Sequence, residues 1–152
     1  MNEQANLASM QKYHDRWNSG DIDGVLALFD ENTRNHGRPV GRAGVEMVIR
    51  DIFDTFPDVH MQPEHVVAVG DDVIVRCTFS GTHKGIGQLP VNGGLLVGVQ
   101  PTGKHFAVQH IHWMTFANGL IVEHRANRDD IGMMVQLGLL PAPLPFRPPP
   151  SN

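Results

Sequence analysis

Apolar residues recur every three or four positions in three stretches of the first 56 residues, which is the spacing of amphipathic helices. The pattern predicts helices over residues 3–19, 22–29 and 41–56, with Asp21 capping the second and Pro57 ending the third. The expected buried faces are Leu7, Met10, Tyr13, His14 and Trp17; Val25, Leu26, Leu28 and Phe29; and Val45, Val48, Ile49, Ile52 and Phe53. The polar segment 32–39 is expected to be extended.

From residue 59 the pattern becomes strand-like and predicts two hairpins. The first joins residues 59–69 to 73–81 through Gly70-Asp71-Asp72, and the second turns at Ala117-Asn118-Gly119. Asn-Gly favours a tight turn because both residues tolerate positive φ. The first arm of the second hairpin carries on one face Phe106, Val108, His110, His112, Met114 and Phe116. A short helix is expected over 130–137, after the second arm.

Helices followed by strands predict a segregated α+β fold, in which a curved antiparallel sheet is wrapped by three N-terminal helices and a short C-terminal helix. Such a cone-shaped, barrel-like arrangement leaves a pocket between its layers. We expect a single domain over residues 1–140 and a Pro-rich extended tail over 141–152. The Gly-rich segment 81–103 is expected to be a long connection and a possible lid.

Composition narrows the range of functions. The chain has 152 residues, a formal net charge of −4 and one cysteine, Cys77. This charge gives no electrostatic basis for binding nucleic acid or an anionic membrane, and we expect neither partner. Cys77 lies in an apolar strand pattern and is expected to be a buried hydrophobe in a cytoplasmic protein. No phosphate-binding glycine motif follows a predicted strand, so we expect no nucleotide site.

The far end of the second hairpin holds the candidate chemistry. Its second arm turns from apolar to ionisable residues and ends at Asp129, just before the last predicted helix. In an apolar pocket a carboxylate becomes a stronger base, so Asp129 is the candidate general base, with His110, His112 or Arg125 stabilising the enolate. The alternative is that Asp129 and Asp130 cap the helix and pair with Arg125 or Arg128. A metal site formed by His110, His112 and His124 is a further, less favoured alternative, and we expect no metal.

Four segments together suggest a family. Residues 81–85 (GTHKG), 101–104 (PTGK), 118–123 (NGLIVE) and 129–138 (DDIGMMVQLG) resemble, in order and spacing, the SnoaL-like polyketide cyclases of the nuclear transport factor 2-like superfamily. The resemblance extends from Tyr13 to Leu140. It implies cofactor-independent ring closure of a polyketide by intramolecular aldol condensation, an aspartate base matched by Asp129, and a homodimer formed through the outer sheet face.

The resulting hypothesis is a cyclase-like enzyme without cofactor that acts on a hydrophobic carbonyl or ester compound. Its catalytic residues are Asp129, His112 and Arg125. Its substrate-binding residues are Tyr13, Trp17, His36, Phe53, Arg76, His110 and Asn127. Two alternatives remain: a non-catalytic small-molecule binding dimer of the same fold, and a hydrolase resembling limonene-type epoxide hydrolases. The second would require an Asp-Arg-Asp arrangement, for which Arg125 and Asp129 supply only two members.

Overall fold

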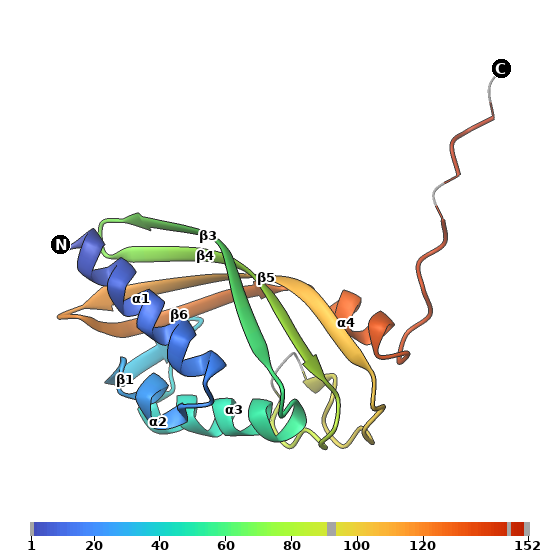
Figure 1. Cartoon of the computed structure of the whole chain (residues 1–152), viewed down its shortest axis with the longest axis horizontal. Helices are drawn as coiled ribbons and strands as arrows, with labels where there is room; N and C mark the ends of the chain where they lie inside the picture. The colour runs from blue at the N-terminus through green and yellow to red at the C-terminus, as the bar shows by residue number, and fades with distance from the viewer. Residues whose placement is uncertain (1, 91–93, 146, 151–152) are drawn as a thin grey trace.

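The computed structural model describes residues 2–90, 94–145 and 147–150, and Figure 1 shows its arrangement. Helices come first and most of the sheet follows. In chain order the elements are α1 (Glu3–Asn18), α2 (Ile22–Leu26), β1 (Phe29–Asn35), β2 (Arg38–Pro39), α3 (Gly41–Thr55), β3 (His60–Val69), β4 (Asp72–Thr82), β5 (His105–Ala117), β6 (Leu120–Arg128) and α4 (Asp130–Gln136). The predicted α+β layout is therefore confirmed.

The strands form one curved, unclosed sheet in the order β2-β1-β6-β5-β4-β3. Its neighbours are antiparallel except β1 and β6, which run parallel. Asn118 and Gly119 both have positive φ at the β5–β6 turn, as the sequence predicted. β4 pairs with β5 over the whole length of β4, from Asp72 opposite Thr115 to Thr82 opposite His105, and β5 and β6 are the two central strands of the sheet. The expected antiparallel sheet thus acquires one parallel pair at its β1 side.

The predicted second helix is shorter than expected. α2 ends at Leu26, and Phe29 begins β1. Asp21 is the N-cap of α2, and its side chain accepts a hydrogen bond from the Gly24 amide at 2.9 Å. Phe29 faces the core from a strand because β1 pairs there with Ile121 of β6, a tertiary contact that helical periodicity does not reveal.

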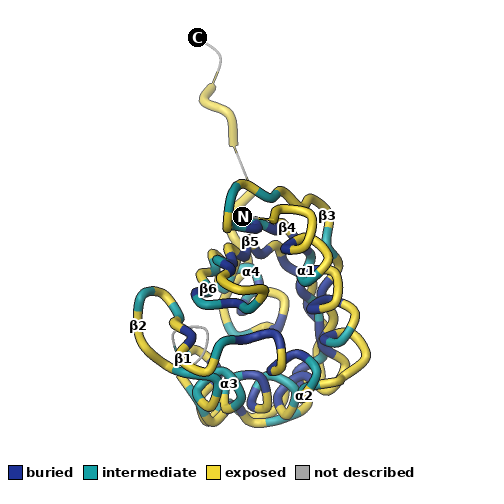
Figure 2. Tube along the Cα trace, turned by 90° about the vertical axis from the view of Figure 1, so that its left-hand side faces the viewer, coloured by how far each residue is buried: buried dark blue, intermediate teal, exposed yellow. Residues whose placement is uncertain are grey.

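The helices cover the concave face of the sheet, and buried residues concentrate between the two layers (Figure 2). α1 turns Met10, Tyr13 and Trp17 inward, and α3 contributes Ile49. On β5 every second residue from Phe106 to Phe116 is buried, which is the alternation predicted from the sequence. None of the described helices is long and apolar enough to cross a membrane.

A β-bulge in β6 decides which of its residues face the helices. Ile121 pairs with Phe116 and is fully buried, whereas Glu123 pairs with Thr115, so two steps along β6 match one step along β5. Side chains alternate between the two faces of a strand, so the extra residue reverses the alternation. His124 lies opposite Met114, on the inner face.

The segment between β4 and β5 is attached to α3. The buried carboxylate of Asp51 accepts hydrogen bonds from the amides of Gln88 at 2.8 Å and Leu89 at 3.2 Å. The Thr55 carbonyl accepts two more, from Lys84 and Gly85. At Gly85 a Cβ would overlap the carbonyl oxygen of Asp54, so only glycine permits this approach. These contacts hold the segment against the end of the helical layer.

Residues 141–145 and 147–150 form no helix or strand and are exposed, and in Figure 1 this tail leads away from the body of the protein. Leu144 is 92% exposed.

Candidate functional site

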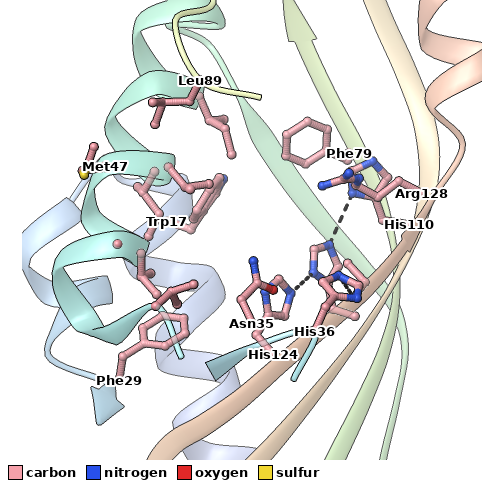
Figure 3. Close-up of a pocket in the computed structure, with 18 of the residues that line it drawn as sticks. Trp17, Phe29, Asn35, His36, Met47, Phe79, Leu89, His110, His124 and Arg128 are labelled. Carbon is pink, nitrogen blue, oxygen red and sulfur yellow. Dashed lines mark hydrogen bonds between the residues drawn. The ribbon is translucent and has the colours of Figure 1, made fainter. Parts of the chain in front are cut away.

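A cavity of about 410 Å³ lies between the helices and the concave face of the sheet. Its wall is mostly apolar and includes side chains from α1, α3, β1, β4, β5 and β6 (Figure 3). The polar lining residues are Tyr13, Trp17, Asn35, His36, His110, His112, His124 and Arg128. No aspartate or glutamate is among the described residues that line it. The cavity therefore suits a small apolar molecule with few polar groups.

Three histidines form a hydrogen-bonded chain along the sheet side of the cavity. Nδ1 of His110 lies 3.3 Å from Nε2 of His112, and Nδ1 of His112 lies 2.9 Å from Nε2 of His124. Two of the histidines are successive inward residues of β5, and the third is on β6 after the bulge. His110 stacks on Phe79 with ring centroids 4.5 Å apart, and the rings of His112 and His124 stack at 5.2 Å. These contacts fix the ring planes.

Burial keeps this chain uncharged. It lowers the pKa of His110 to about 3, with the nearby positive charge of Arg128 acting in the same direction. It also lowers the pKa of His124 to about 4 and that of His112 well below its ordinary value. A neutral imidazole has one donor and one acceptor nitrogen, so each hydrogen bond in the chain fixes the direction of the next. If one proton enters at one end of the chain and another leaves at the other end, the tautomer of every ring reverses.

Two buried polar atoms in the cavity wall lack partners. Trp17 Nε1 and Asn35 Oδ1 are inaccessible to solvent and have no hydrogen-bond partner within the described part of the chain. Trp17 is only 2% exposed, and it packs against Phe53 with ring centroids 5.2 Å apart. Asn35 is placed beside His124 by the parallel pairing of β1 and β6.

His36 lies at the cavity rim and is tied to β6. Its amide donates to the His124 carbonyl at 2.9 Å, and its Nε2 accepts a hydrogen bond from the Ala126 amide at 3.2 Å. Because Nε2 is the acceptor, the proton of the neutral ring is on Nδ1. His36 has φ of 51° and Gly37 has φ of 77°, so this tight turn returns the chain along β1 and directs the ring toward β6.

Asp129 lies outside the cavity. It is exposed, and its carboxylate is the N-cap of α4, accepting a hydrogen bond from the Gly132 amide at 2.8 Å. Asp130 pairs with Arg128, with Oδ1 and Nε 3.4 Å apart. This is the geometry of the capping alternative. The expectation of a desolvated carboxylate at Asp129 is thus not met, because the helix start holds the side chain in solvent.

The cavity brings together only some of the other predicted residues. Tyr13, Trp17, His36, His110 and His112 line it, and burial raises the pKa of Tyr13. Arg76, Arg125 and Asn127 do not line it; all three are exposed, and each pairs across the sheet with a residue of the outer face. Nη2 of Arg125 lies 3.6 Å from Oε1 of Glu123, and Nε of Arg76 lies 3.8 Å from Oε2 of Glu64. Phe53 supports Trp17 without reaching the cavity.

Sequence reasoning missed Asn35 and Arg128 as lining residues, and it considered His124 only as a metal ligand. Their inward orientation depends on the bulge in β6 and on the parallel β1–β6 pair. The spacing of His124, Ala126 and Arg128 indicates that they share one face of a strand, but it does not indicate which face is inward.

Within the described residues, no group of three or more histidine, cysteine or acidic side chains is arranged to hold a metal ion. The ring nitrogens of His112 both hydrogen-bond to neighbouring histidines and do not converge with them on a common point. The arrangement can bind an apolar ligand, donate a hydrogen bond to it and exchange a proton with it.

The sequence profile of the SnoaL-like polyketide cyclases matches residues 8–137. Among solved structures, IdmH from Streptomyces antibioticus, a proposed polyketide cyclase, is 27% identical with a TM-score of 0.71, over 88% of this chain and 98% of that one. TsrD from Streptomyces laurentii is 24% identical with a TM-score of 0.77, over 92% of this chain and 99% of that one. AclR from Streptomyces galilaeus, a proposed hydroxylase, is 24% identical with a TM-score of 0.76, over 92% of this chain and 89% of that one. No curated protein matches the sequence.

Proposed function

The chain belongs to the SnoaL-like polyketide cyclase family. We propose that it catalyses cofactor-independent, aldol-type chemistry on a hydrophobic carbonyl compound. In this proposal His110 has the proton-transfer role that the sequence suggested for Asp129. The observation that carries the proposal is the chain of three neutral histidines on the wall of an otherwise apolar cavity. The aldol class itself comes from the family.

His110 is the end of the histidine chain from which a proton can enter. Its Nδ1 bonds to His112, while its Nε2 has no hydrogen bond to a described residue. In one of the two tautomer directions, Nδ1 carries the proton and Nε2 is a free acceptor. In the other direction Nε2 carries the proton and is a donor. The same ring can therefore serve as base or acid without becoming charged at rest.

The proposed step conserves atoms and charge. The C–H bond next to the substrate carbonyl breaks, its electron pair enters the enolate, and its proton goes to Nε2 of His110. The enolate carbon then attacks a second carbonyl of the same molecule, forming the C–C bond, and the resulting alkoxide takes the proton back from Nε2 of His110, which returns to its neutral form. Burial makes the imidazolium costly, so His110 holds the proton only until the alkoxide takes it back. Arg128 supplies a positive charge on the same wall for the anion.

The test uses 2-acetylnaphthalene, whose methyl protons exchange slowly with solvent. Purified protein is incubated with it in D₂O, and loss of the methyl proton signal is followed by NMR. We expect wild-type protein to catalyse exchange, His110→Gln to lose on the order of 100-fold or more of the rate, and Asp129→Asn to stay within about threefold of wild type. Asparagine retains the helix cap, which makes Asp129→Asn a matched control.

Loss of exchange in Asp129→Asn with full activity in His110→Gln would return the base to Asp129 and overturn the assignment. Binding of the ketone by wild type without any exchange would instead favour a non-catalytic binding protein. That second candidate has its own support, because no carboxylate is among the described residues that line the cavity and a histidine with a pKa of about 3 is a weak base. The epoxide-hydrolase alternative has no such support, since it needs acidic residues in the cavity.

We also propose that the protein forms a homodimer through the outer face of its sheet. Val67, Ile74 and Trp113 make a row across β3, β4 and β5 on that face, and Val67 and Trp113 are 53% and 43% exposed. Apolar surface of this kind favours contact with a second copy. Light scattering after size-exclusion chromatography should give a dimer mass for wild type and a monomer mass for Trp113→Lys. A monomeric wild type would refute the proposal.

A further inference from the structure

The cavity wall has two further polar groups besides the ring nitrogens of the histidine chain. Four buried polar atoms lack hydrogen-bond partners within the described chain, and two of them, Trp17 Nε1 and Asn35 Oδ1, belong to residues that line the cavity. A buried N–H without a partner costs about 1–3 kcal/mol, so such groups call for an explanation. A ligand atom is the explanation that their position offers.

Trp17 is placed to act on a ligand. It comes from α1, on the helical wall, whereas the histidine chain lies on β5 and β6. Figure 3 shows the indole across the cavity from His110, with its ring nitrogen turned toward the space between them. Tyr13 stacks on the same ring at 6.0 Å and Phe53 packs on it at 5.2 Å, which fixes its orientation. The N–H is therefore preorganised as a donor.

Trp17 Nε1 and Asn35 Oδ1 each require a different kind of hydrogen-bonding atom on the ligand. An indole N–H can only donate, so it requires an acceptor atom. The Asn35 oxygen can only accept, so it requires a donor. A hydroxyl group satisfies both kinds of requirement, whereas a hydrocarbon satisfies neither. Asn35 pairs beside His124, which is at the opposite end of the histidine chain from His110.

We propose that the cavity takes an elongated, apolar carbonyl compound bearing a second oxygen function, preferably a hydroxyl, at the end remote from the reacting carbonyl, with Trp17 donating to that oxygen. The inference rests on the proposed function for the position of the reacting carbonyl. Trp17 is then a specificity-determining residue, and Asn35 a second contact to the same end of the ligand.

The test compares two ligands of equal shape, 6-hydroxy-2-acetylnaphthalene and 6-methyl-2-acetylnaphthalene, by calorimetric titration of wild type and of Trp17→Phe. One hydrogen bond is worth about 0.5–1.5 kcal/mol, so wild type should bind the hydroxyl compound roughly 2- to 13-fold more tightly than the methyl compound. In Trp17→Phe the ratio should fall to about one. Because the variant changes cavity shape for both ligands alike, the ratio isolates the N–H.

Each outcome is decisive. Equal binding of both compounds to wild type overturns the inference without any variant and leaves the proposed function standing. A preference that persists unchanged in Trp17→Phe also overturns it, since the hydroxyl would then be recognised elsewhere. Failure of wild type to bind either compound would count against the proposed function itself. Should Trp17→Phe fail to fold, Asn35→Leu gives the same comparison at the other contact and should also reduce the preference.

Discussion

Lowering the pH from 7.0 to 5.5 should destabilise this protein strongly, because burial lowers the pKa of five histidines, and in His14, His110, His112 and His124 the pKa falls far enough to keep the ring neutral at pH 5.5. Burial lowers the pKa of His14 to about 4, that of His110 to about 3 and that of His124 to about 4, and it lowers the pKa of His112 well below its ordinary value of 6.5. Between these values and 6.5 the unfolded chain binds a proton at each histidine and the folded chain does not. Stability therefore falls as the pH falls through this window.

The loss of unfolding free energy between pH 7.0 and 5.5 depends little on the pKa values of the folded protein, as long as these lie well below 5.5. For one such histidine, protonation of the unfolded state between pH 7.0 and 5.5 costs about 1.2 kcal/mol of unfolding free energy. The four together cost about 5 kcal/mol, which is comparable to the whole stability of many domains. Carboxylates change the unfolding free energy only at lower pH. Hydrogen bonds from Thr78 and Gln109 lower the pKa of Glu64 from 4.5, so the contribution of Glu64 to stability stays constant between pH 7.0 and 5.5.

Urea unfolding followed by tryptophan fluorescence at pH 7.0 and 5.5 measures the effect. His14→Gln should reduce the pH-dependent loss by about 1.2 kcal/mol, whatever it does to stability at either pH alone. His60→Gln, at an exposed position of β3, is the matched control and should leave the loss as in wild type. If wild type lost less than about 1 kcal/mol between the two pH values, the neutral histidine chain would be refuted.

Three further outcomes follow from packing and hydrogen bonds. Asp51→Asn leaves the amides of Gln88 and Leu89 without their carboxylate, so hydrogen exchange at both should accelerate and stability should fall by about 2 kcal/mol in urea unfolding; unchanged exchange would contradict this. Gly85→Ala should cost about 2 kcal/mol or more, measured the same way, because its methyl group overlaps a backbone carbonyl of α3. Burial raises the pKa of Cys77 to about 12, so a thiol reagent should modify it only as the chain unfolds, and reaction in native buffer would show the thiol to be accessible.

The sequence predicted most of the fold because the strongest signals are local. Helical spacing identified α1 and α3, and Asn118-Gly119 located the β5–β6 turn. Alternation on β5 placed His110 and His112 on the same face as Phe106 and Phe116, and the structure shows that this face is buried. Each of these features depends on residues within a few positions of one another.

The site was predicted less well, because it depends on how β6 pairs with β5 and with β1, and β1 is distant from β6 in the sequence. Arg125, Asn127 and Asp129 share the parity of Ile121, which faces the core, so uninterrupted alternation would have placed all three inside. The irregular pairing after Ile121 sends them to the other side. No local signal in residues 120–129 announces an extra residue, because a bulge arises from the pairing of two strands and not from one strand alone.

The extra residue of β6 determines which of two sets of polar side chains on this strand faces the cavity. His124, Ala126 and Arg128 line the cavity, whereas Arg125 and Asn127 lie on the opposite face of the strand. Deleting a single codon near Val122 would remove the bulge and turn Arg125 and Asn127 toward the cavity in place of His124 and Ala126. Relatives that differ by one residue here could therefore have reached different catalysts from nearly the same gene.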